Sequence, residues 1–505
     1  MTDSRVKNTK RNISAGMLNS IVSILFPFAV RTGILYVLGE QYVGLSSLFV
    51  SILQVLNLAE LGFASAVVYN MYKPLAEGNT TIVCGLLEYY KKIYRVIGSF
   101  IFVIGLLILP WITNLIHGSW PSEINIYVLY FLYLLNSSLS YFLFAYKNSI
   151  LNAAQRMDII QKIHLFVHIV QYIAEFLLIV LFQNFYAFVC VSIVATIGNN
   201  IAVSIMSKRY FPQYVAKGNI DSGLKKSIRK QVAGLMIGKL CDTSRNSFDS
   251  IVLSSFLGLT IVAIYNNYYY IYSGLYAIMI VIMNAMQASV GNSIAVESKE
   301  KNYRDLLKFQ FIFSWITGWI TVCMFTLYQP FMKLWAGESL MLSFRDMTLF
   351  CAYFYAINMN GMRNLYFSGS GLWWNAKSAF VFEALGNLVL NIFLGYFWGV
   401  SGVLVATLLT IVVFNYFHRT QILFKQYFET ITAKKFYVNQ FLYLLVVALC
   451  CLVNYLLCKG LDPNGDIVLK MAICLIVPNV MMIAFFHRKK EFSELRSFAQ
   501  KFLKR

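Results

Sequence analysis

Four charged side chains lie within the apolar stretch 231–258 and could bind an anion or an ion inside a membrane. They are Lys239, Asp242, Arg245 and Asp249. At 100° per residue on a helix, all four point into one sector roughly 120° wide, over about 15 Å of helix axis. A charge at bilayer depth costs roughly 2.5–3.5 kcal/mol on insertion scales, so such a stripe persists where it faces partners or water. We interpret it as the wall of a polar cavity.

The same four charges also have a purely structural interpretation. Asp242 and Arg245 are three residues apart, and Arg245 and Asp249 are four apart, so both pairs could form ion pairs within one helix. This alternative suits Asp249, which is placed near the outer surface, better than it suits Lys239. Both interpretations stay open.

Further ionisable side chains interrupt other apolar stretches. Arg31 and Arg363 have no acid within one turn of their own predicted helices. Each therefore offers positive charge to a ligand unless Glu60, Glu175 or Glu383 pairs with it from another helix. Amides accompany the acids at helical spacing, with Gln54 and Asn57 before Glu60, and Asn387 and Asn391 after Glu383. This pattern favours a wet interior lined by some of the helices.

Two histidines four residues apart, His164 and His168, resemble a pair of metal ligands. A metal site would need a third ligand, and no further His lies in the neighbouring predicted helices. Alternatives are a cavity wall whose histidines exchange protons near neutral pH, and simple polarity at a helix end. No metal or other cofactor is expected.

Composition predicts a membrane protein whose helices position these residues. Apolar residues make up 59% of the chain and charged residues 13%, whereas soluble chains have about 25% charged residues. Windows of about 19 residues predict about fourteen transmembrane helices in an all-α integral membrane protein. The predicted spans are 13–38, 43–70, 93–116, 124–148, 161–182, 185–206, 231–256, 261–290, 309–331, 347–369, 376–396, 399–417, 437–458 and 467–486.

Lys and Arg sort the predicted loops by side of the membrane. With the N-terminus in the cytoplasm, 34 of the 42 Lys and Arg fall on the cytoplasmic side, including those from Arg419 to Lys435. Because excess Lys and Arg stay on the untranslocated side, both termini are predicted to be cytoplasmic. The net charge of +20 is spread over these loops, which indicates attraction to anionic lipid and not nucleic acid.

An internal repeat predicts two equivalent halves. The turn at 38–45 parallels the turn at 257–264 in its pattern of residues, and parallel repeats place a substrate site at their interface. The predicted parts are an N-terminal six-helix lobe (1–207), a cytoplasmic linker (208–230), a C-terminal six-helix lobe (231–430), and two additional helices with a basic tail (431–505).

Several runs resemble those of bacterial polysaccharide repeat-unit flippases, the O-antigen and capsule exporters of the polysaccharide transporter family in the MATE-like superfamily. The similar runs are RTGILYVLG at 31–39, YVGLSSLFVSILQVLNLAELG at 42–62, MYKPLA at 71–76, SFDSIVLS at 247–254, AIYNNY at 263–268, SGSGLW at 368–373 and EALGN at 383–387. The resemblance covers the range 1–430, in the order and spacing of that family.

The resemblance implies transfer of an undecaprenyl-pyrophosphate-linked oligosaccharide from the cytoplasmic to the outer leaflet of a bacterial plasma membrane by alternating access. A pyrophosphate with its sugars cannot cross about 30 Å of hydrocarbon unaided. Arg31, Lys239, Arg245 and Arg363 are the candidates for holding the pyrophosphate or acidic sugars. Glu60, Glu175, Asp242, Asp249 and Glu383 are the candidates for pairing with them or for binding a coupling proton or sodium ion. The candidate amides for sugar hydroxyls are Gln54, Asn57, Asn266, Asn267, Asn358, Asn387 and Asn391.

Other functions remain as alternatives. No G-x-x-x-x-G-K-[ST] loop is present, which favours a secondary transporter over a P-loop ATPase. A flippase for a lipid-linked peptidoglycan precursor would recognise the same pyrophosphate. A polysaccharide polymerase or ligase is less favoured, because even the longest predicted outer connection, 333–346, is short, and no enzymatic activity is expected. Expected partners are the lipid-linked oligosaccharide, membrane lipid, and the polymerase and chain-length machinery.

Overall fold

The computed structural model describes residues 22–60, 62–462 and 465–494, with only the backbone of 59, 234, 235, 237–246 and 288. Every regular element in these ranges is a helix, and the described chain contains no strand. The chain divides into two compact units, unit 1 from Met1 to Ala263 and unit 2 from Ile264 to Arg505. The predicted all-helical fold class is confirmed.

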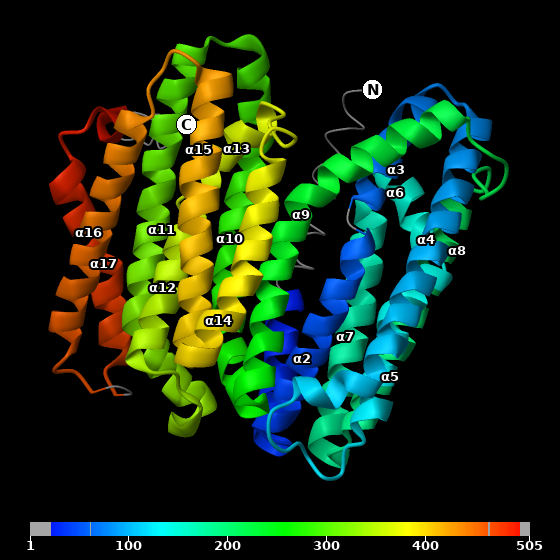
Figure 1. The fold of residues 1–505 in the computed structure, drawn as a ribbon, viewed down its shortest axis with the longest axis horizontal. Coiled ribbons are helices and arrows are strands. Elements are labelled where there is room, and N and C mark those ends of the chain that lie inside the picture. The colour runs from blue at the N-terminus through cyan, green and yellow to red at the C-terminus, as the bar shows by residue number, and fades with distance from the viewer. Residues whose placement is uncertain (1–21, 61, 463–464, 495–505) are drawn as a thin grey trace. The chain divides into compact units, whose positions relative to one another are not determined.

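Unit 1 is a bundle of long helices, some of them joined by short helical elements (Figure 1). Its elements are the helix Val22–Val37, α2 (Glu40–Leu56), η1 (Asn57–Glu60), α3 (Phe63–Ala76), α4 (Thr80–Ile108), η2 (Leu109–Leu115), α5 (Ile126–Phe142), η3 (Ala145–Lys147), α6 (Asn148–Ala153), α7 (Met157–Phe182), α8 (Phe185–Tyr210) and α9 (Ser222–Leu257). α7 packs along α8, α4 along α5, and α9 along α2. α9, which the sequence analysis assigned to the second lobe, is therefore grouped with unit 1.

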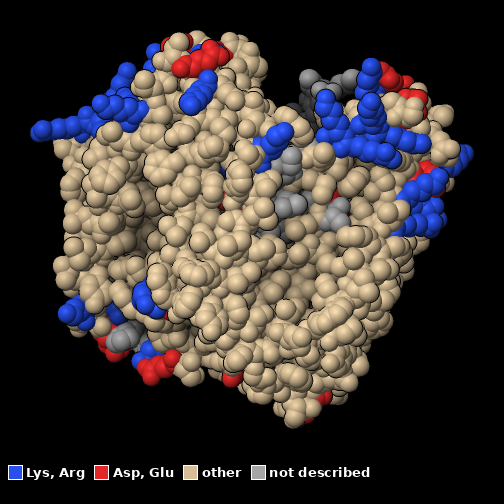
Figure 2. Space-filling view, in the orientation of Figure 1, with Lys and Arg blue, Asp and Glu red and all other residues tan. Residues whose placement is uncertain are grey.

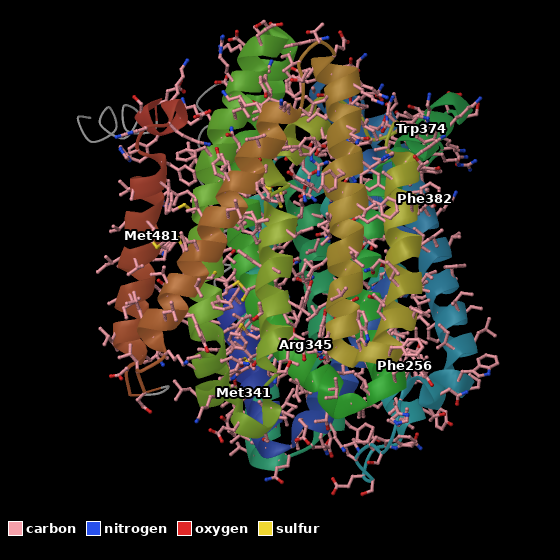
Figure 3. All side chains as sticks on the ribbon, turned by 60° about the vertical axis from the view of Figure 1, so that its left-hand side comes forward. Phe256, Met341, Arg345, Trp374, Phe382 and Met481 are labelled. Carbon is pink, nitrogen blue, oxygen red and sulfur yellow. The ribbon has the colours of Figure 1, made fainter. Side chains whose placement is uncertain are left out.

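Unit 2 contains a second bundle with two further helices at its edge (Figure 1). Its elements are α10 (Leu259–Val296), which starts in unit 1, α11 (Lys299–Ala336), η4 (Glu338–Leu340), α12 (Phe344–Asn358), α13 (Gly361–Gly369), α14 (Lys377–Thr410), the π-helical η5 (Ile411–His418), α15 (Arg419–Leu423), the π-helical η6 (Phe424–Phe428), α16 (Lys434–Cys458) and α17 (Ile467–Phe486). α16 and α17 pack on α11 through an apolar core that includes Phe311, Tyr443 and Met482. Met481 of α17, labelled in Figure 3, packs against this core.

Helix length and composition support a protein that crosses the membrane many times. Within the described chain, eight helices are long and apolar enough to span, or nine if α5 and the bent segment Ala145–Ala153 form one span. Shorter apolar helices cover Val22–Val37, Glu40–Leu56 and Ser247–Leu257. The number of fourteen spans and the cytoplasmic termini stay predictions.

Two predicted spans, 376–396 and 399–417, fall in one continuous helical run that is sharply kinked. The kink is at Gly399, whose φ of 57° and ψ of −132° are not helical. Glycine adopts positive φ at little cost because it has no Cβ. A Cβ on Gly402 would lie only 1.9 Å from the backbone oxygen of Leu394, so the turn also brings backbone segments too close for a side chain.

The two halves of the chain have corresponding helices at nearly constant spacing. α2 and α10 begin at Glu40 and Leu259, α4 and α11 at Thr80 and Lys299, α5 and α12 at Ile126 and Phe344, and α7 and α14 at Met157 and Lys377. In each pair the separation along the chain is almost the same, and it matches the offset between the two similar turns in the sequence. Asn79 and Ser298 follow the same spacing, and their side chains cap α4 and α11. α16 and α17 have no counterpart in this scheme.

Lys and Arg of unit 1 gather at one end of its bundle, the upper end in Figure 2. The chain has no Lys or Arg between Arg95 and Lys147, or between Lys162 and Lys208. These stretches contain the opposite end of α4, α5, α7 and α8. Such asymmetry is typical of a membrane bundle whose charged end stays in the cytoplasm.

Candidate functional site

A break in a helix forms the first candidate site, in unit 1. Between α2 and α3 the chain makes the tighter 3-10 turn η1, followed by Gly62 with a φ of 94°. Breaks of this kind at membrane depth are tolerated where the freed backbone lines protein or a cavity, and they commonly mark binding sites. The break carries Asn57 and Glu60 on one turn.

Tyrosine hydroxyls surround the Glu60 carboxylate. Tyr94 donates a hydrogen bond to Oε1, and Tyr141 donates one to Oε2 at 2.6 Å. Tyr90 donates to the Tyr94 hydroxyl, so a chain of two tyrosines leads to the acid. Asn57 exchanges hydrogen bonds of 3.2 and 3.3 Å with Ser137. Among the described residues, no Lys or Arg forms an ion pair with Glu60, so neutral donors alone stabilise its charge there.

A second acid of unit 1, Glu175 on α7, lies in a similar setting. It is 3% exposed, and its Oε1 accepts hydrogen bonds from Gln171 at 2.7 Å and from Ser192 of α8 at 2.6 Å. No ion pair of Glu175 occurs within the described ranges. The helix that carries Arg31 packs on the same α7, since a Cβ on Gly33 would lie 3.3 Å from the Phe176 ring. Arg31 itself is partly buried.

His164 and His168 lie beside one another on α7, with ring centroids 5.6 Å apart. Asn199 of α8 is 3.3 Å from His164 Nε2. Over the part of the chain that the structure describes, no three His, Cys, Asp or Glu side chains come together as metal ligands. His164 thus takes part in a polar contact between α7 and α8, whereas the His168 ring lies against His164 and Tyr172 of its own helix.

The charged stripe of α9 lies mostly outside the described residues, because the side chains of Lys239, Asp242 and Arg245 are not described. Asp249 is fully buried. Near it, Ser247 donates a hydrogen bond to Gln54 of α2 at 3.1 Å. The described part of α9 is thus attached to α2 by polar contacts.

Unit 2 has its own broken helix, and a buried arginine follows the break. α12 ends at Asn358, and α13 begins at Gly361. A Cβ on Gly361 would lie 2.7 Å from Met283 and from Phe313, so α13 approaches its neighbours closely here. Arg363, in the first turn of α13, is completely buried.

The Arg363 guanidinium uses only one of its nitrogens for protein contacts in the described chain. Nη2 donates to Asn360 Oδ1 at 2.8 Å and contacts Asn415 of η5 at the backbone oxygen (2.8 Å) and at Oδ1 (2.6 Å). Nε and Nη1 have no hydrogen-bond partner among the described residues. Unsatisfied buried donors cost roughly 1–3 kcal/mol each, and more when charged, so an acceptor placed beside Nε and Nη1 would be stabilising.

A buried ion pair lies next to Arg363. Arg419 of α15 donates to the Glu383 carboxylate, and its guanidinium lies 3.7 Å from the centre of the Phe380 ring. α15, which carries Arg419, packs against α13, which carries Arg363. Phe382, labelled in Figure 3, is 58% exposed, whereas the next residue, Glu383, is fully buried. The acid that the sequence analysis considered as a partner for Arg31 or Arg363 thus pairs with Arg419.

The remaining predicted amides of unit 2 are buried, except Asn266. Asn387 of α14 donates to Thr407 at 3.0 Å, and Asn391 donates to Asn387 at 3.3 Å, so they extend the polar row that starts at Glu383. Asn358 and Asn267 are buried, the former with its amide bonded to the carbonyl oxygen of Phe354 at 2.8 Å. Asn266 is partly buried.

Corresponding helices of the two units are joined by different polar groups. In unit 1, α8 contacts α5 through Thr196 and Asn136 at 2.7 Å and through Asn200 and Ser140 at 3.1 Å. By the constant spacing of the two halves, α8 corresponds to the end of α14, η5 and α15, and α5 corresponds to α12. In unit 2, Asn415 lies at the position that corresponds to Thr196, and it accepts a hydrogen bond from Arg363, which lies on α13 and not on α12. The position of Arg363 corresponds to Phe144 in unit 1, and the nearby Lys147 donates to Ser204 of α8 at 2.8 Å.

Several site residues escaped the sequence analysis. Arg419 was grouped with loop cations, whereas it is buried in a helix. Asn415 and the tyrosines around Glu60 were not singled out. The available signal for Arg419 was its spacing of four from Asn415, because both lie on an apolar pattern that continues as far as Leu423.

No protein-family model and no curated protein matches this sequence. Solved structures do match it. An inward-facing multidrug resistance MATE family transporter of the MOP superfamily aligns over 80% of this chain and 98% of its own, with TM-score 0.63 and 13% identity. The lipid II flippase MurJ in an inward closed conformation aligns over 93% and 99%, with TM-score 0.63 and 17% identity. A MOP superfamily transporter from Pyrococcus furiosus aligns over 83% and 96%, with TM-score 0.54 and 14% identity.

The chain has the fold of the MOP-superfamily transporters. These identities establish the fold alone. Within the MOP fold of this chain, unit 1 holds two acids stabilised by neutral donors, Glu60 and Glu175. Unit 2 holds a buried arginine with free donors beside an ion pair. These groups could bind a cation or proton in the first unit and an anionic group in the second.

Proposed function

We propose that this chain is a flippase for an undecaprenyl-pyrophosphate-linked oligosaccharide repeat unit of an O-antigen, capsule or exopolysaccharide. It transfers the unit from the cytoplasmic to the outer leaflet of a bacterial plasma membrane by alternating access, as a secondary transporter and not an enzyme. The proposal includes a topology of fourteen transmembrane helices with both termini in the cytoplasm. The MOP fold and the sequence resemblance over the range 1–430 support it.

The observation that carries the proposal is the arginine after the break in unit 2. Arg363 is completely buried, and its Nε and Nη1 have no acceptor in the described chain. A planar guanidinium suits two oxygens of one phosphate better than an ammonium does. The Glu383–Arg419 pair nearby keeps a second guanidinium in place. Two arginines and one acid leave this region of unit 2 cationic, which suits a pyrophosphate.

The acids of unit 1 supply the coupling step in this proposal. Glu60 and Glu175 accept hydrogen bonds from uncharged side chains only, in the described structure, so no ion pair there would have to break when a cation binds. Asp242 and Asp249 on α9 are further candidates from the sequence. Binding of the ion would favour one state of the alternating-access cycle over the other.

A lipid-linked peptidoglycan precursor is the second candidate cargo. The match to the lipid II flippase MurJ over 93% of this chain favours it, since a precursor of that kind also carries a pyrophosphate. The fold accommodates different charges, because the Pyrococcus furiosus transporter is described as having a binding pocket of reverse polarity. The two cargoes differ in their sugars and can be separated by experiment.

Deleting the gene in its native host is expected to cause one lipid-linked glycan to accumulate in the cytoplasmic leaflet. The accumulated lipid is extracted and identified by mass spectrometry, and surface glycan is measured before and after complementation. A polysaccharide repeat unit supports the first cargo, and a peptidoglycan precursor supports the second. Unchanged lipid-linked glycans together with normal surface glycan would contradict both.

Replacing Glu60 with glutamine is expected to remove the dependence of transport on an ion gradient. The amide oxygen still accepts from one of the two tyrosines, and the other hydroxyl can turn to accept from the amide NH2, so the protein should fold, but the charge at this position no longer changes. Transport is measured in vesicles with an imposed proton or sodium gradient. The matched control is Glu77→Gln, because Glu77 forms an exposed pair with Lys73 at 3.8 Å. A Glu60→Gln variant that still responds to the gradient like the wild type would exclude Glu60 from coupling.

A further inference from the structure

A groove of about 580 Å³ lies on unit 1, at the end where its Lys and Arg gather. It opens between α4, the segment before α9, and the first turns of α9, and Figure 1 shows this part of α9 running across the ends of the neighbouring helices. Cations and apolar side chains share its lining. The residues that matter here are Tyr89, Lys92, Ile93, Val96, Lys225 and Arg229.

Three cations converge on the groove, and two of them have no acidic partner in the described chain, where no carboxylate lies within 4.0 Å of Lys225 or Arg229. Lys92 is 3.7 Å from Glu88, and its side chain is 61% exposed, so this pair is weak and open to competition. The groove therefore has an excess of positive charge that fits an anion.

Apolar surface continues from the groove along α4. Val96 lines the groove, and Phe100, Val103 and Leu107 follow at steps of four, three and four residues, which place them on one face of the helix. These four side chains are between 52% and 69% exposed. In a protein that spans a membrane, such a stripe faces the acyl chains of the lipids. An anion bound in the groove would then lie at the headgroup level, at the end of this stripe.

The wall of the groove is rigid. At Gly85 of α4, a Cβ would lie 2.9 Å from Ile220 and 3.1 Å from the backbone oxygen of Asn219, so the segment before α9 packs tightly on the helix. Ile220 and Ile228 are both buried and hold the start of α9 in place. The backbone that carries Lys225 and Arg229 is therefore held in place by packing.

We propose that this groove is a binding site for an anionic phospholipid of the leaflet at the charged end of unit 1. The headgroup phosphate contacts Lys92, Lys225 and Arg229, and one acyl chain runs along the stripe that begins at Val96. A soluble phosphate would use the cations but not the stripe. A zwitterionic lipid would use the stripe but gain less from the cations. Phosphatidylglycerol combines both features.

The test compares lipids retained by the purified full-length protein. The protein is reconstituted in nanodiscs of phosphatidylglycerol and phosphatidylcholine in equal amounts, released, and examined by native mass spectrometry. The wild type should retain phosphatidylglycerol preferentially. The double variant Lys225→Gln/Arg229→Gln should lower that preference about 30-fold, as expected for two surface cations. The variant Ile93→Trp, which fills the apolar part and keeps the cations, should lower it as well.

The matched control is Lys208→Gln/Lys217→Gln, which removes two cations from the same end of unit 1 outside the groove lining. It should retain the wild-type preference. The proposal is overturned if Lys225→Gln/Arg229→Gln behaves like the wild type, or if the control loses as much. Displacement of the bound lipid by an equal concentration of glycerol phosphate would show a site for a soluble anion instead. Retention of undecaprenyl phosphate in place of phosphatidylglycerol would assign the groove to the cargo lipid, and would also overturn the proposal.

Discussion

Replacing Arg363 with alanine is expected to lower export of surface glycan at least about 30-fold while the protein still inserts. Removing a buried cation that pairs with a phosphate of the ligand costs roughly 2–5 kcal/mol of binding, and about 1.4 kcal/mol corresponds to a factor of ten. The alanine variant lacks the hydrogen bonds to Asn360 and Asn415. It also lacks Nε and Nη1, which have no partner in the described chain and are proposed to bind the ligand. Export is measured in a deletion strain, normalised to the amount of protein in the membrane.

Conservative variants separate a role in binding from a role in stability. Arg363→Lys keeps the charge but not the planar fork, so it should retain more export than alanine and less than arginine. Arg345→Ala is the matched control, because Arg345 (Figure 3) lies on the adjoining α12 with a largely exposed side chain, 4.0 Å from Asp346. It should export like the wild type. Normal export by Arg363→Ala at wild-type protein levels would remove Arg363 from the site.

The variant Arg419→Ala is expected to destabilise the protein by about 3–5 kcal/mol, because it removes the cation of a buried ion pair with Glu383. Contact with the Phe380 ring is lost as well, which contributes roughly 0.5–2 kcal/mol. Glu383→Ala should have a similar effect, since Arg419 would then be the uncompensated charge. The change in stability is measured by thermal unfolding in detergent, with the remaining folded protein quantified by size-exclusion chromatography.

A double substitution tests whether pairing is the cause. In Glu383→Leu/Arg419→Met both charges are replaced by apolar groups of similar volume, which is often neutral for a buried pair. We expect this variant to be more stable than Arg419→Ala, although it should export poorly because the region has lost a guanidinium. If the double variant is as unstable as the sum of the single ones, the two residues act independently.

Hydropathy was sufficient to predict the fold class, because backbone groups in a bilayer must be satisfied within helices. Helical spacing also placed some side chains together. Asn57 and Glu60, three residues apart, lie on the same turn of η1. Glu383, Asn387 and Asn391, at steps of four, form one buried row in α14.

The parts that sequence reasoning missed depend on irregular backbone and on distant contacts. The break before Arg363 and the π-helical turns around Asn415 change which residues face one another, and no periodic pattern reveals them. Arg419 was assigned to a loop because a cation next to His418 looks like the end of a span. The tyrosines that bind Glu60 come from α4 and α5, so only packing brings them to it.

The constant spacing between corresponding helices points to an evolutionary origin of the two halves. Duplication and fusion of one ancestral gene would produce it, with α16 and α17 acquired separately. Two identical copies would have offered any ligand the same charge twice. After fusion, each copy was free to diverge, so the second copy has Asn415 and Arg363 at the positions where the first has Thr196 and Phe144. The electrical difference between the halves is then a product of divergence, and ancestral reconstruction of the repeat should recover a more neutral precursor.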